Sequence, residues 1–411
     1  MGIFQTVIIY FFLFVGIYFE VFILFTYLTH RKEIKADEKA SYEREVYPSV
    51  TIVVPIWNEE KTVSKTVQSL LAMNYPQDKL KIFVVDDGST DSSWEIVQQY
   101  AGHPQIELYH KENGGKHTAV NYAIDRSTSE FFGCLDADSE VDADTLKKMI
   151  CKFDDPETMA VTPAMKIYNP KTLIQSVQSV EYVFGILVKK VMGILGGIHV
   201  TPGPFTIFRK AAFDKIGKFK KAHNTEDMEI AFRLQANHMK IDNMHTAWVY
   251  TTGPTTVYKL YKQRLRWTYG FLKNAWDYKF LFLNKEYGNV GLLTIPTAVV
   301  LIGGVIFTVF LLMYRIVNFL VQKFLLWKAV GFLMPQFEFS LFYVSAKLNI
   351  FLTLFVFMLM FTLVYNAQKL TSEPLRPGRV ALYFVVFPLI SPFWVIRSVF
   401  NAVFGRKTHW R

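Results

Sequence analysis

Apolar residues fill both ends of the chain, and a mixed pattern of apolar and polar residues lies between them. The first apolar stretch runs from Ile3 to Leu28, which is long enough to cross a bilayer as a helix. From about residue 286 the chain is apolar again, whereas the middle has the composition of an ordinary globular domain. The pattern therefore predicts a transmembrane helix over 1–30, a globular domain over 45–285 and a membrane region over 286–405.

The number of crossings in the last region stays open, and with it the side on which the C-terminus lies. Three stretches in this region have spanning length: 290–313, 341–365 and 381–404. A further apolar stretch, 317–333, carries two lysines, so it either spans the bilayer or lies in its interface. Basic residues flank both ends of the last stretch, which one simple crossing does not explain. Pro388 and Pro392 favour a kinked or re-entrant element there.

Composition and charge also indicate a membrane protein. The chain is 51% hydrophobic and only 19% charged, which is too apolar for a soluble protein of 411 residues. His30–Lys32 and Lys35 directly follow the first span, which predicts a multi-pass protein of the plasma membrane with its globular domain in the cytoplasm. Such flanking residues also account for the net charge of +10, and without a reader motif nucleic acid is not an expected partner. Glu20, inside the first span, either has a function or pairs with a residue such as Lys347.

In the globular domain, short β-branched runs alternate with segments of helical periodicity. Strands are predicted to begin near residues 49, 80, 105 and 130, each followed by a helix or a turn. This rhythm predicts an α/β domain with a mostly parallel sheet and flanking helices. Ligands of such sheets bind beyond the carboxyl ends of the strands, and the acidic clusters of this domain fall at those ends.

The acidic clusters suggest a metal-bound nucleotide diphosphate. Asp136 and Asp138 follow the fourth strand and point the same way, so their charges need a cation between them. A hard divalent ion, Mg²⁺ or Mn²⁺, would join them to phosphate oxygens. Lys116 begins a helix behind two glycines, which suits a diphosphate, although a plain capped turn explains it as well. Asp87 follows the second strand and either accepts hydrogen bonds from a nucleoside or belongs to a common turn.

A candidate general base lies further along the chain. Thr225, Glu226 and Asp227 open a predicted helix, where Asp227 could take a proton from an attacking hydroxyl. The alternative is structural: Thr225 caps the helix, and the two acids favour the positive end of its dipole.

Two segments of the domain are predicted to be interface helices that dock it on the bilayer, at 171–195 and 258–285, and the alternative for 171–195 is an internal core helix. The second contains Gln263, Arg266 and Trp267. Arg266 could steady a leaving diphosphate, and Trp267 is a good platform for the face of a sugar. A solvated basic helix beside the membrane is the simpler account of the same residues.

Taken in order, these motifs resemble the membrane-embedded processive synthases of glycosyltransferase family 2, which make cellulose, chitin, hyaluronan and poly-N-acetylglucosamine. The resemblance covers residues 47–278 by motif, through "DDGS", "DAD", "TPGPFTIFRK", "TED" and "QRLRW", and the rest by its layout of spans. It implies the GT-A nucleotide-sugar fold. Pro202 and Pro204 around the glycine of the third motif, and Ala123 where relatives often have glycine, depart from the usual pattern.

The resemblance also implies a role for each matching position. It implies nucleotide-sugar binding by Asn58, Glu59, Asp87, Lys116, Asp136, Gln263 and Trp267. It implies acceptor contacts by Gly203, Phe205 and Trp267, metal ligation by Asp138 and Asp136, and catalysis by Asp227, Glu226 and Arg266.

The expected activity is an inverting transfer from a UDP-sugar to the end of a growing β-linked polysaccharide, with N-acetylglucosamine favoured as the sugar. The spans would border a path for export, and an accessory membrane subunit is a possible partner. One alternative is a single addition of sugar to a polyprenyl phosphate or another lipid, which the "QRLRW" motif disfavours. Another is a membrane nucleotide sensor without catalysis, which would be expected to lack Asp227 or Arg266.

Overall fold

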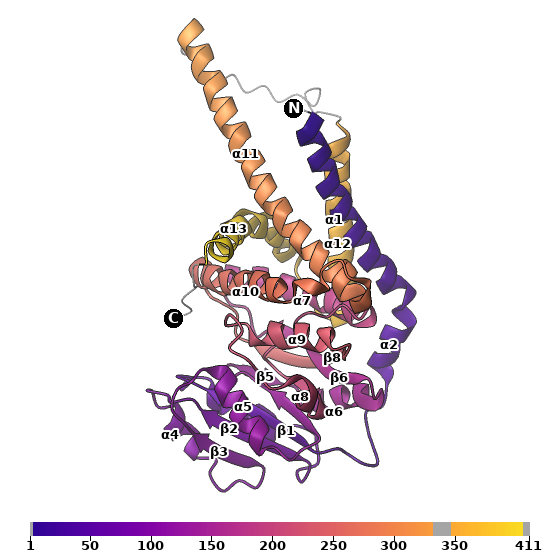
Figure 1. Ribbon diagram of the computed structural model, residues 1–411, viewed down its shortest axis with the longest axis vertical. Helices are drawn as coiled ribbons and strands as arrows, with labels where there is room; N and C mark the ends of the chain where they lie inside the picture. Colours follow the sequence, from indigo (N-terminus) through magenta and orange to yellow (C-terminus); the bar gives the residue numbers. More distant parts are fainter. Residues whose placement is uncertain (1–2, 332–346, 406–411) are drawn as a thin grey trace.

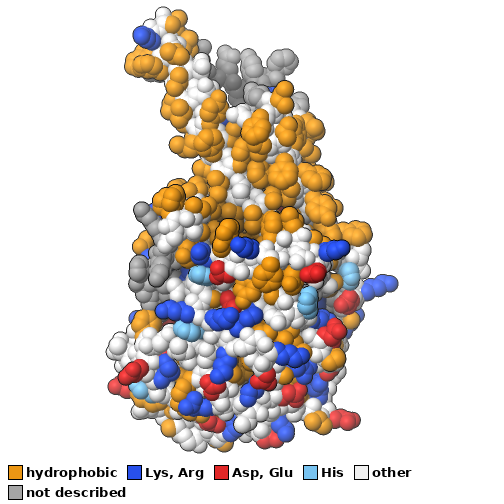
Figure 2. Space-filling view, viewed as in Figure 1, with side chains coloured by type: hydrophobic (Ala, Val, Ile, Leu, Met, Phe, Trp, Pro, Cys, Tyr) orange, Lys and Arg blue, Asp and Glu red, His pale blue; other side chains and the backbone are white. Residues whose placement is uncertain are grey.

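The structure, a computed structural model, describes residues 3–331 and 347–405. It is an α/β domain from one side of which long helices extend (Figure 1). In the described part of the chain, four helical segments are long and apolar enough to cross a membrane: Ile3–Thr29, Val290–Val330, Leu348–Thr371 and Pro377–Val403. Figure 2 shows apolar side chains over these helices and charged side chains over the α/β domain. The predicted fold class, an α/β domain together with helices long and apolar enough to cross a membrane, is thus confirmed, whereas the predicted domain bounds stay a prediction.

These apolar segments correspond to helices α1 (Ile3–Thr29), α11 (Ile295–Val330, preceded by the π-helical η4, Val290–Thr294), α12 (Leu348–Thr371) and α13 (Pro377–Val403). Helix α11 continues without a break through the stretch that carries Lys323 and Lys328. At 1.5 Å per residue its 36 residues are about 54 Å long, which exceeds a hydrocarbon core of about 30 Å. Helix α13 contains Pro388 and Pro392 and lies across the base of the other three, beside α10 (Val257–Asp277; Figure 1). The first residues of the predicted span 341–365, and the basic residues after 405, lie outside the described residues.

Glu20 is buried in α1, and its Oε2 has no hydrogen-bond partner among the described residues. Lys347 is exposed at the start of α12, and within the described chain it forms no ion pair with Glu20, so the pairing considered from the sequence is not found there.

One eight-stranded mixed sheet forms the centre of the domain, in the order β3-β2-β1-β4-β7-β6-β8-β5. Its strands are β1 (Val50–Ile56), β2 (Leu80–Asp86), β3 (Ile106–His110), β4 (Phe131–Cys134), β5 (Ser139–Val141), β6 (Thr158–Ile167), β7 (Thr206–Arg209) and β8 (Lys240–Thr251). Strands β1 to β4 are mutually parallel, whereas β7 is antiparallel to both β4 and β6. The carboxyl ends of β1, β2 and β4 therefore meet at one edge, and β7 brings the loop before it to the same edge.

Helices cover both faces of the sheet and shield its apolar side chains from water. They are α3 (Val63–Leu71), α4 (Ser93–Gln98), α5 (Lys116–Arg126), α6 (Thr145–Ile150), α8 (Ala211–Ile216) and α9 (Glu226–Ala236), with short 3₁₀ turns η1 (Cys151–Asp154), η2 (Lys279–Leu281) and η3 (Lys285–Tyr287). The β-branched strand residues, such as Ile52, Val53 and Val54, are fully buried, and successive residues enter opposite hydrophobic clusters.

The two helices predicted to lie at the interface are α7 (Leu173–Ile194) and α10. Helix α7 packs against β6 and β8 on one side and α12 and α13 on the other, so it lies between the sheet and the apolar helices (Figure 1). A capping box begins it, in which Thr172 accepts from Gln175 N and the Gln175 side chain accepts from Thr172 N. Contact of α7 and α10 with the bilayer itself stays a prediction.

A short helix after the first span, α2 (Arg31–Lys39), is bound to the domain by buried ion pairs. Asp37 accepts from Lys152 and from Lys190, each at 2.8 Å, and the Lys190 side chain is only 2% exposed. The domain and the first span are therefore joined by more than the chain itself.

Candidate active site

A cavity of about 680 Å³ opens where the carboxyl ends of β1, β2 and β4 meet. Its walls combine acidic and basic side chains. The lining residues with charged or ring side chains are Trp57, Glu59, Asp87, Lys116, His117, Asp136, Asp138, Lys221, Glu226 and Arg266. This is the position predicted for a ligand, because the acids other than Glu226, which begins α9, follow the carboxyl ends of strands.

Asp87 shapes the glycine turn in the wall of the cavity. Its carboxylate accepts from Lys111 Nζ at 2.5 Å, Gly114 N at 3.1 Å and Gly115 N at 2.8 Å, and Asp87 is 3% exposed. Gly115 has a φ of 90°, which a residue with a Cβ adopts only with strain. Asp87 and the two glycines therefore fix where α5 begins and where Lys116 lies.

Lys116 projects from the first turn of α5 and forms an ion pair with Asp136, with Glu226 at 3.9 Å. Burial disfavours the ammonium, but the surrounding acids, Asp136 first, outweigh it and raise the pKa of Lys116. Lys116 is thus held as a cation in the middle of the cavity.

Asp136 and Asp138 form a charge cluster together with Glu59. Burial, and then the like charges of Asp136 and Glu59, raise the pKa of Asp138 to about 6. Within the described chain, no group of three or more His, Cys, Asp or Glu side chains is arranged to enclose a metal. Mg²⁺ and Mn²⁺ do not need such a cage, since they bind through one or two carboxylates, water and substrate phosphates. The two carboxylates are accessible from the cavity and repel each other, so they fit a divalent cation that arrives with a phosphate ligand.

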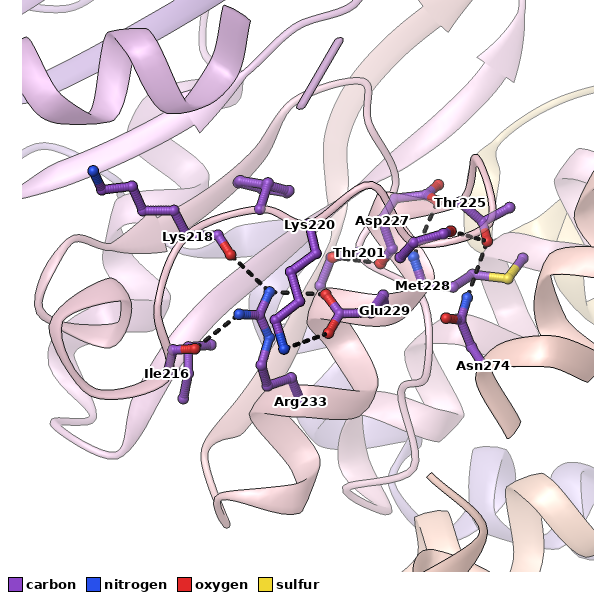
Figure 3. A network of polar contacts seen from close by, with 12 residues as sticks. Thr201, Ile216, Lys218, Lys220, Thr225, Asp227, Met228, Glu229, Arg233 and Asn274 are labelled. Carbon is purple, nitrogen blue, oxygen red and sulfur yellow. Dashed lines mark hydrogen bonds and ion pairs between the residues drawn. The ribbon is translucent and has the colours of Figure 1, made fainter. Parts of the chain in front are cut away.

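Asp227 lies beside this cavity at the start of α9. Burial and the adjacent Glu226 raise its pKa to about 6, although Arg266 and Lys116 act in the opposite direction. Its backbone oxygen accepts from Thr201 N at 3.1 Å and Thr201 Oγ1 at 2.8 Å, which fixes the turn (Figure 3). Glu226 lines both the large cavity and a small adjoining one, whereas Asp227 lines the small one, together with Gly203. The two acids therefore share the small cavity, and Glu226 also faces the large one.

The structural alternative for residues 225–227, in which Thr225 caps the helix and the two acids favour its dipole, is only partly found. Thr225 has no capping hydrogen bond, because its Oγ1 donates to Ala222 O at 3.2 Å and accepts from Asn274 at 3.0 Å (Figure 3). The acids at the first turn of α9 do lie at the positive end of the helix dipole.

Gly203 and Phe205 lie on the loop before β7. A Cβ on Gly203 would lie 2.6 Å from Lys116 Nζ and about 3 Å from the Asp136 carboxylate, so a larger residue there would displace one of these side chains. The Phe205 side chain is fully buried in the core, and its backbone N donates to Cys134 O at 2.6 Å. The Phe205 ring is therefore not exposed at the cavity surface and does not itself provide the predicted contact with an acceptor.

The residues predicted on α10 are divided in the structure. Arg266 reaches the large cavity and donates to Asn224 O at 2.8 Å. Trp267 does not line that cavity. The centre of its ring lies 4.3 Å from Cζ of Arg264, the residue that follows Gln263 in the motif. Arg264 in turn donates to Glu181 on α7 at 2.7 Å.

Asn58 likewise lies outside the cavity lining. Its side-chain oxygen accepts from Thr90 N at 2.8 Å and so holds the turn after β2. Sequence reasoning overlooked Trp57, Asn113, His117, Lys221 and Asn224, which line the cavity. His117 adjoins the glycine motif and could have been found from it, whereas Lys221 and Asn224 lie in a basic segment without a recognisable pattern.

With this geometry established, comparison with known proteins is informative. Residues 51–217 match the profile of the family described as Glycosyl transferase family 2. Over 260 residues the chain is 29% identical to the poly-beta-1,6-N-acetyl-D-glucosamine synthase of Staphylococcus aureus (strain COL), covering 62% of this chain and 63% of that protein. It is 28% identical over 271 residues to the synthase of the same name from Staphylococcus epidermidis, covering 64% and 65%. The matched region thus spans less than two thirds of the length of these relatives.

Among solved structures, the fold is similar to that of the mannosyltransferase PcManGT from Pyrobaculum calidifontis in complex with GDP-Man and Mn²⁺. The TM-score is 0.55 at 16% identity, and the alignment covers 96% of this chain and 99% of that one. This similarity supports the predicted GT-A arrangement of sheet and helices.

Proposed function

We propose that this chain belongs to glycosyl transferase family 2, whose profile matches residues 51–217, and that it transfers a sugar from a UDP-sugar to the end of a growing β-linked polysaccharide. N-acetylglucosamine is the proposed sugar, because the relatives named above are synthases of poly-beta-1,6-N-acetyl-D-glucosamine. The observation that carries the proposal is a half-buried carboxyl, Asp227, beside a cavity that holds paired acids and two fixed cations.

The proposed reaction is a direct displacement. Asp227 takes the proton of the acceptor hydroxyl, whose oxygen attacks the anomeric carbon while the bond to the diphosphate breaks. Arg266 and Lys116 stabilise the negative charge that develops on the leaving diphosphate. A divalent cation held by Asp136 and Asp138 would supply further charge neutralisation there when bound. A single displacement inverts the anomeric centre, so an α-linked donor gives a β-linkage.

The surroundings of the cavity suit an acceptor that is a sugar chain. Gly203 lets the loop before β7 approach Lys116 and Asp136 closely, which leaves the space beside Asp227 for a hydroxyl. The proposed orientation places the α/β domain in the cytoplasm of a multi-pass plasma-membrane protein, since basic residues follow the first span. The donor would then be cytosolic, and the apolar helices would border the path of the product.

Product analysis tests this function. The full-length protein, purified in detergent with Mg²⁺ or Mn²⁺, is offered a panel of labelled UDP-sugars, and every labelled product is sized. We expect a ladder of long products from UDP-N-acetylglucosamine, accompanied by release of UDP. Addition of one sugar to a co-purified lipid would refute the polymer, and binding of nucleotide without product or released UDP would refute the transferase.

A further inference from the structure

The segment between α8 and α9, residues 218–224, forms a loop at the edge of the donor cavity. It contains three lysines and a histidine, and two of its members, Lys221 and Asn224, line the cavity. The loop begins after Gly217, whose φ of 77° favours glycine. It ends directly before Thr225 and the acids of α9.

Asn121 on α5 holds the first part of this loop. Its Nδ2 donates to Phe219 O at 2.8 Å, and its Oδ1 accepts from Phe219 N at 2.9 Å. The Phe219 ring is buried against Phe208 and Phe213, with ring centroids 5.8 and 5.9 Å away. Both the backbone and the side chain of Phe219 are therefore fixed to the domain.

A buried network on α9 holds the same part from the other side (Figure 3). Arg233 donates to Ile216 O at 2.8 Å and to Lys218 O at 2.9 Å, and Glu229 binds the same guanidinium at 2.8 Å. Arg233 and Glu229 are both about 5% exposed, so the pair is shielded from water. Lys220 lies 3.8 Å from Glu229 and faces this network, as Figure 3 shows.

The end of the loop is bound to α10. His223 Nε2 lies 2.8 Å from Asp277, and Arg266 donates to Asn224 O at 2.8 Å. His223 and Asn224 have φ values of 50° and 60°, a left-handed conformation that is uncommon for residues other than glycine. Such a conformation persists where surrounding contacts hold it, and here contacts from α10 do so.

Lys220 and Lys221 lie between the two fixed ends of the loop and have different surroundings. Lys220 faces Glu229, while Lys221 lines the donor cavity. Of the other cations at the cavity, Lys116 is paired with Asp136, and Arg266 contacts the loop backbone. Within the described part of the chain, Lys221 makes no hydrogen bond or ion pair. Its charge is nonetheless felt in the cavity, since after burial it contributes to the lowered pKa of His117.

We propose that Lys221 binds the diphosphate of the nucleotide-sugar donor, and that the 218–224 loop is held rigidly so that Lys221 faces the donor cavity. An ammonium with no partner among the described residues, held at an otherwise acid-rich cavity, suits an anionic ligand. The diphosphate is the anion of choice because Lys116, His117 and Arg266 line the same cavity. Because the loop is already fixed before the donor binds, binding costs little further loop entropy. This inference rests on the proposed function, because it takes a nucleotide sugar as the ligand.

The test compares nucleotides that differ only in their phosphates. Binding of UDP, UMP and uridine to the full-length protein with Mg²⁺ is measured by calorimetry for the wild type, Lys221→Gln, Lys221→Arg and the matched control Lys220→Gln. We expect Lys221→Gln to bind UDP about tenfold more weakly, since a charge-assisted hydrogen bond is worth about 1.4 kcal/mol or more. Uridine affinity stays unchanged, Lys221→Arg recovers most of the loss, and Lys220→Gln binds UDP like the wild type.

Three results overturn the inference and are distinguishable from one another. If the wild type binds UDP and transfers sugar while Lys221→Gln binds UDP equally well, Lys221 does not contact the diphosphate and the proposed function stands. If the wild type neither binds UDP nor transfers sugar, the proposed function fails and the inference fails with it. Equal weakening in Lys221→Gln and Lys220→Gln would show an unspecific charge effect and would also refute it.

Discussion

Two carboxyl groups of the candidate site, Asp138 and Asp227, have the same raised pKa for different reasons. At Asp138 the cause after burial is the nearby pair Asp136 and Glu59, which a cation would neutralise. At Asp227 the cause after burial is Glu226, while Arg266 and Lys116 favour the ionised form. Asp138 is therefore suited to hold a cation, whereas Asp227 is suited to exchange a proton near neutral pH.

The pH dependence of transfer follows from Asp227. Only the ionised carboxylate accepts a proton, so kcat/KM is expected to be constant above its pKa of about 6 and to fall about tenfold per pH unit below it. Asp227→Asn is expected to lower kcat by about 10²–10⁴-fold while UDP binding stays intact, because the base is lost but the donor cavity is not. Rates between pH 5 and 8, with UDP affinity measured alongside, check both. An Asp227→Asn variant as active as the wild type would remove Asp227 from the mechanism.

At the scale of elements, α7 and α10 are joined by a largely buried ion pair. Glu181 on α7 accepts from Arg264 on α10, with side chains 21% and 11% exposed, and the Trp267 ring covers the guanidinium. Burial raises the pKa of Glu181, and Arg264 opposes that shift. The pair therefore fixes α10, which carries Arg266, against α7, which packs against the apolar helices.

Removing one partner of this pair is expected to destabilise the protein. Glu181→Gln leaves the Arg264 charge buried without a counter-ion, which costs about 3 kcal/mol. Its apparent Tm in detergent should fall by several degrees, and a double-mutant cycle with Arg264→Gln should recover part of the loss. The matched control is Glu130→Gln, which breaks the more exposed pair with Arg209 and should change Tm little. Equal Tm values for Glu181→Gln and Glu130→Gln would show that the α7–α10 pair contributes nothing.

At the scale of the whole molecule, the first span is connected to the catalytic domain through α2. Asp37 pairs with Lys190 and Lys152, and although burial acts against its ionised form, these lysines lower its pKa overall. A carboxyl with a lowered pKa stabilises the fold above its ordinary titration range and loses that contribution as pH falls through the lowered value. At neutral pH the contribution is fully present.

Asp37→Asn is expected to release α2 from the domain while leaving membrane insertion unchanged. The variant leaves Lys190, which is 2% exposed, without its counter-ion, so the packed position of α2 becomes unfavourable. Limited trypsin digestion should then cut near Lys35 and Lys39 several-fold faster than in the wild type. The exposed acid Asp78 offers a control, since Asp78→Asn should leave the digestion rate unaltered. Wild-type protection of α2 in Asp37→Asn would contradict the role of this pair.

The prediction from sequence succeeded where the signal is local. Apolar length predicted α1 and the later spans, and β-branched runs predicted β1 to β4 with acids at their ends, because side-chain periodicity depends only on neighbours in the chain. Lys116, Asp136 and Asp138 could be predicted to lie near one another because the carboxyl ends of parallel strands meet at one edge of the sheet.

Other features were decided only by the tertiary structure. The sequence could not tell that β7 inserts antiparallel beside β4, that the Phe205 ring is buried, or that Glu226 lines two cavities, one of them shared with Asp227, because pairing between distant strands leaves no periodic pattern. Nor could it single out Lys221 from its neighbour Lys220, since their surroundings come from α5, α9 and α10, far apart along the chain. Local chemistry is determined by the sequence, whereas which groups meet across the sheet and which face a cavity is determined by long-range packing.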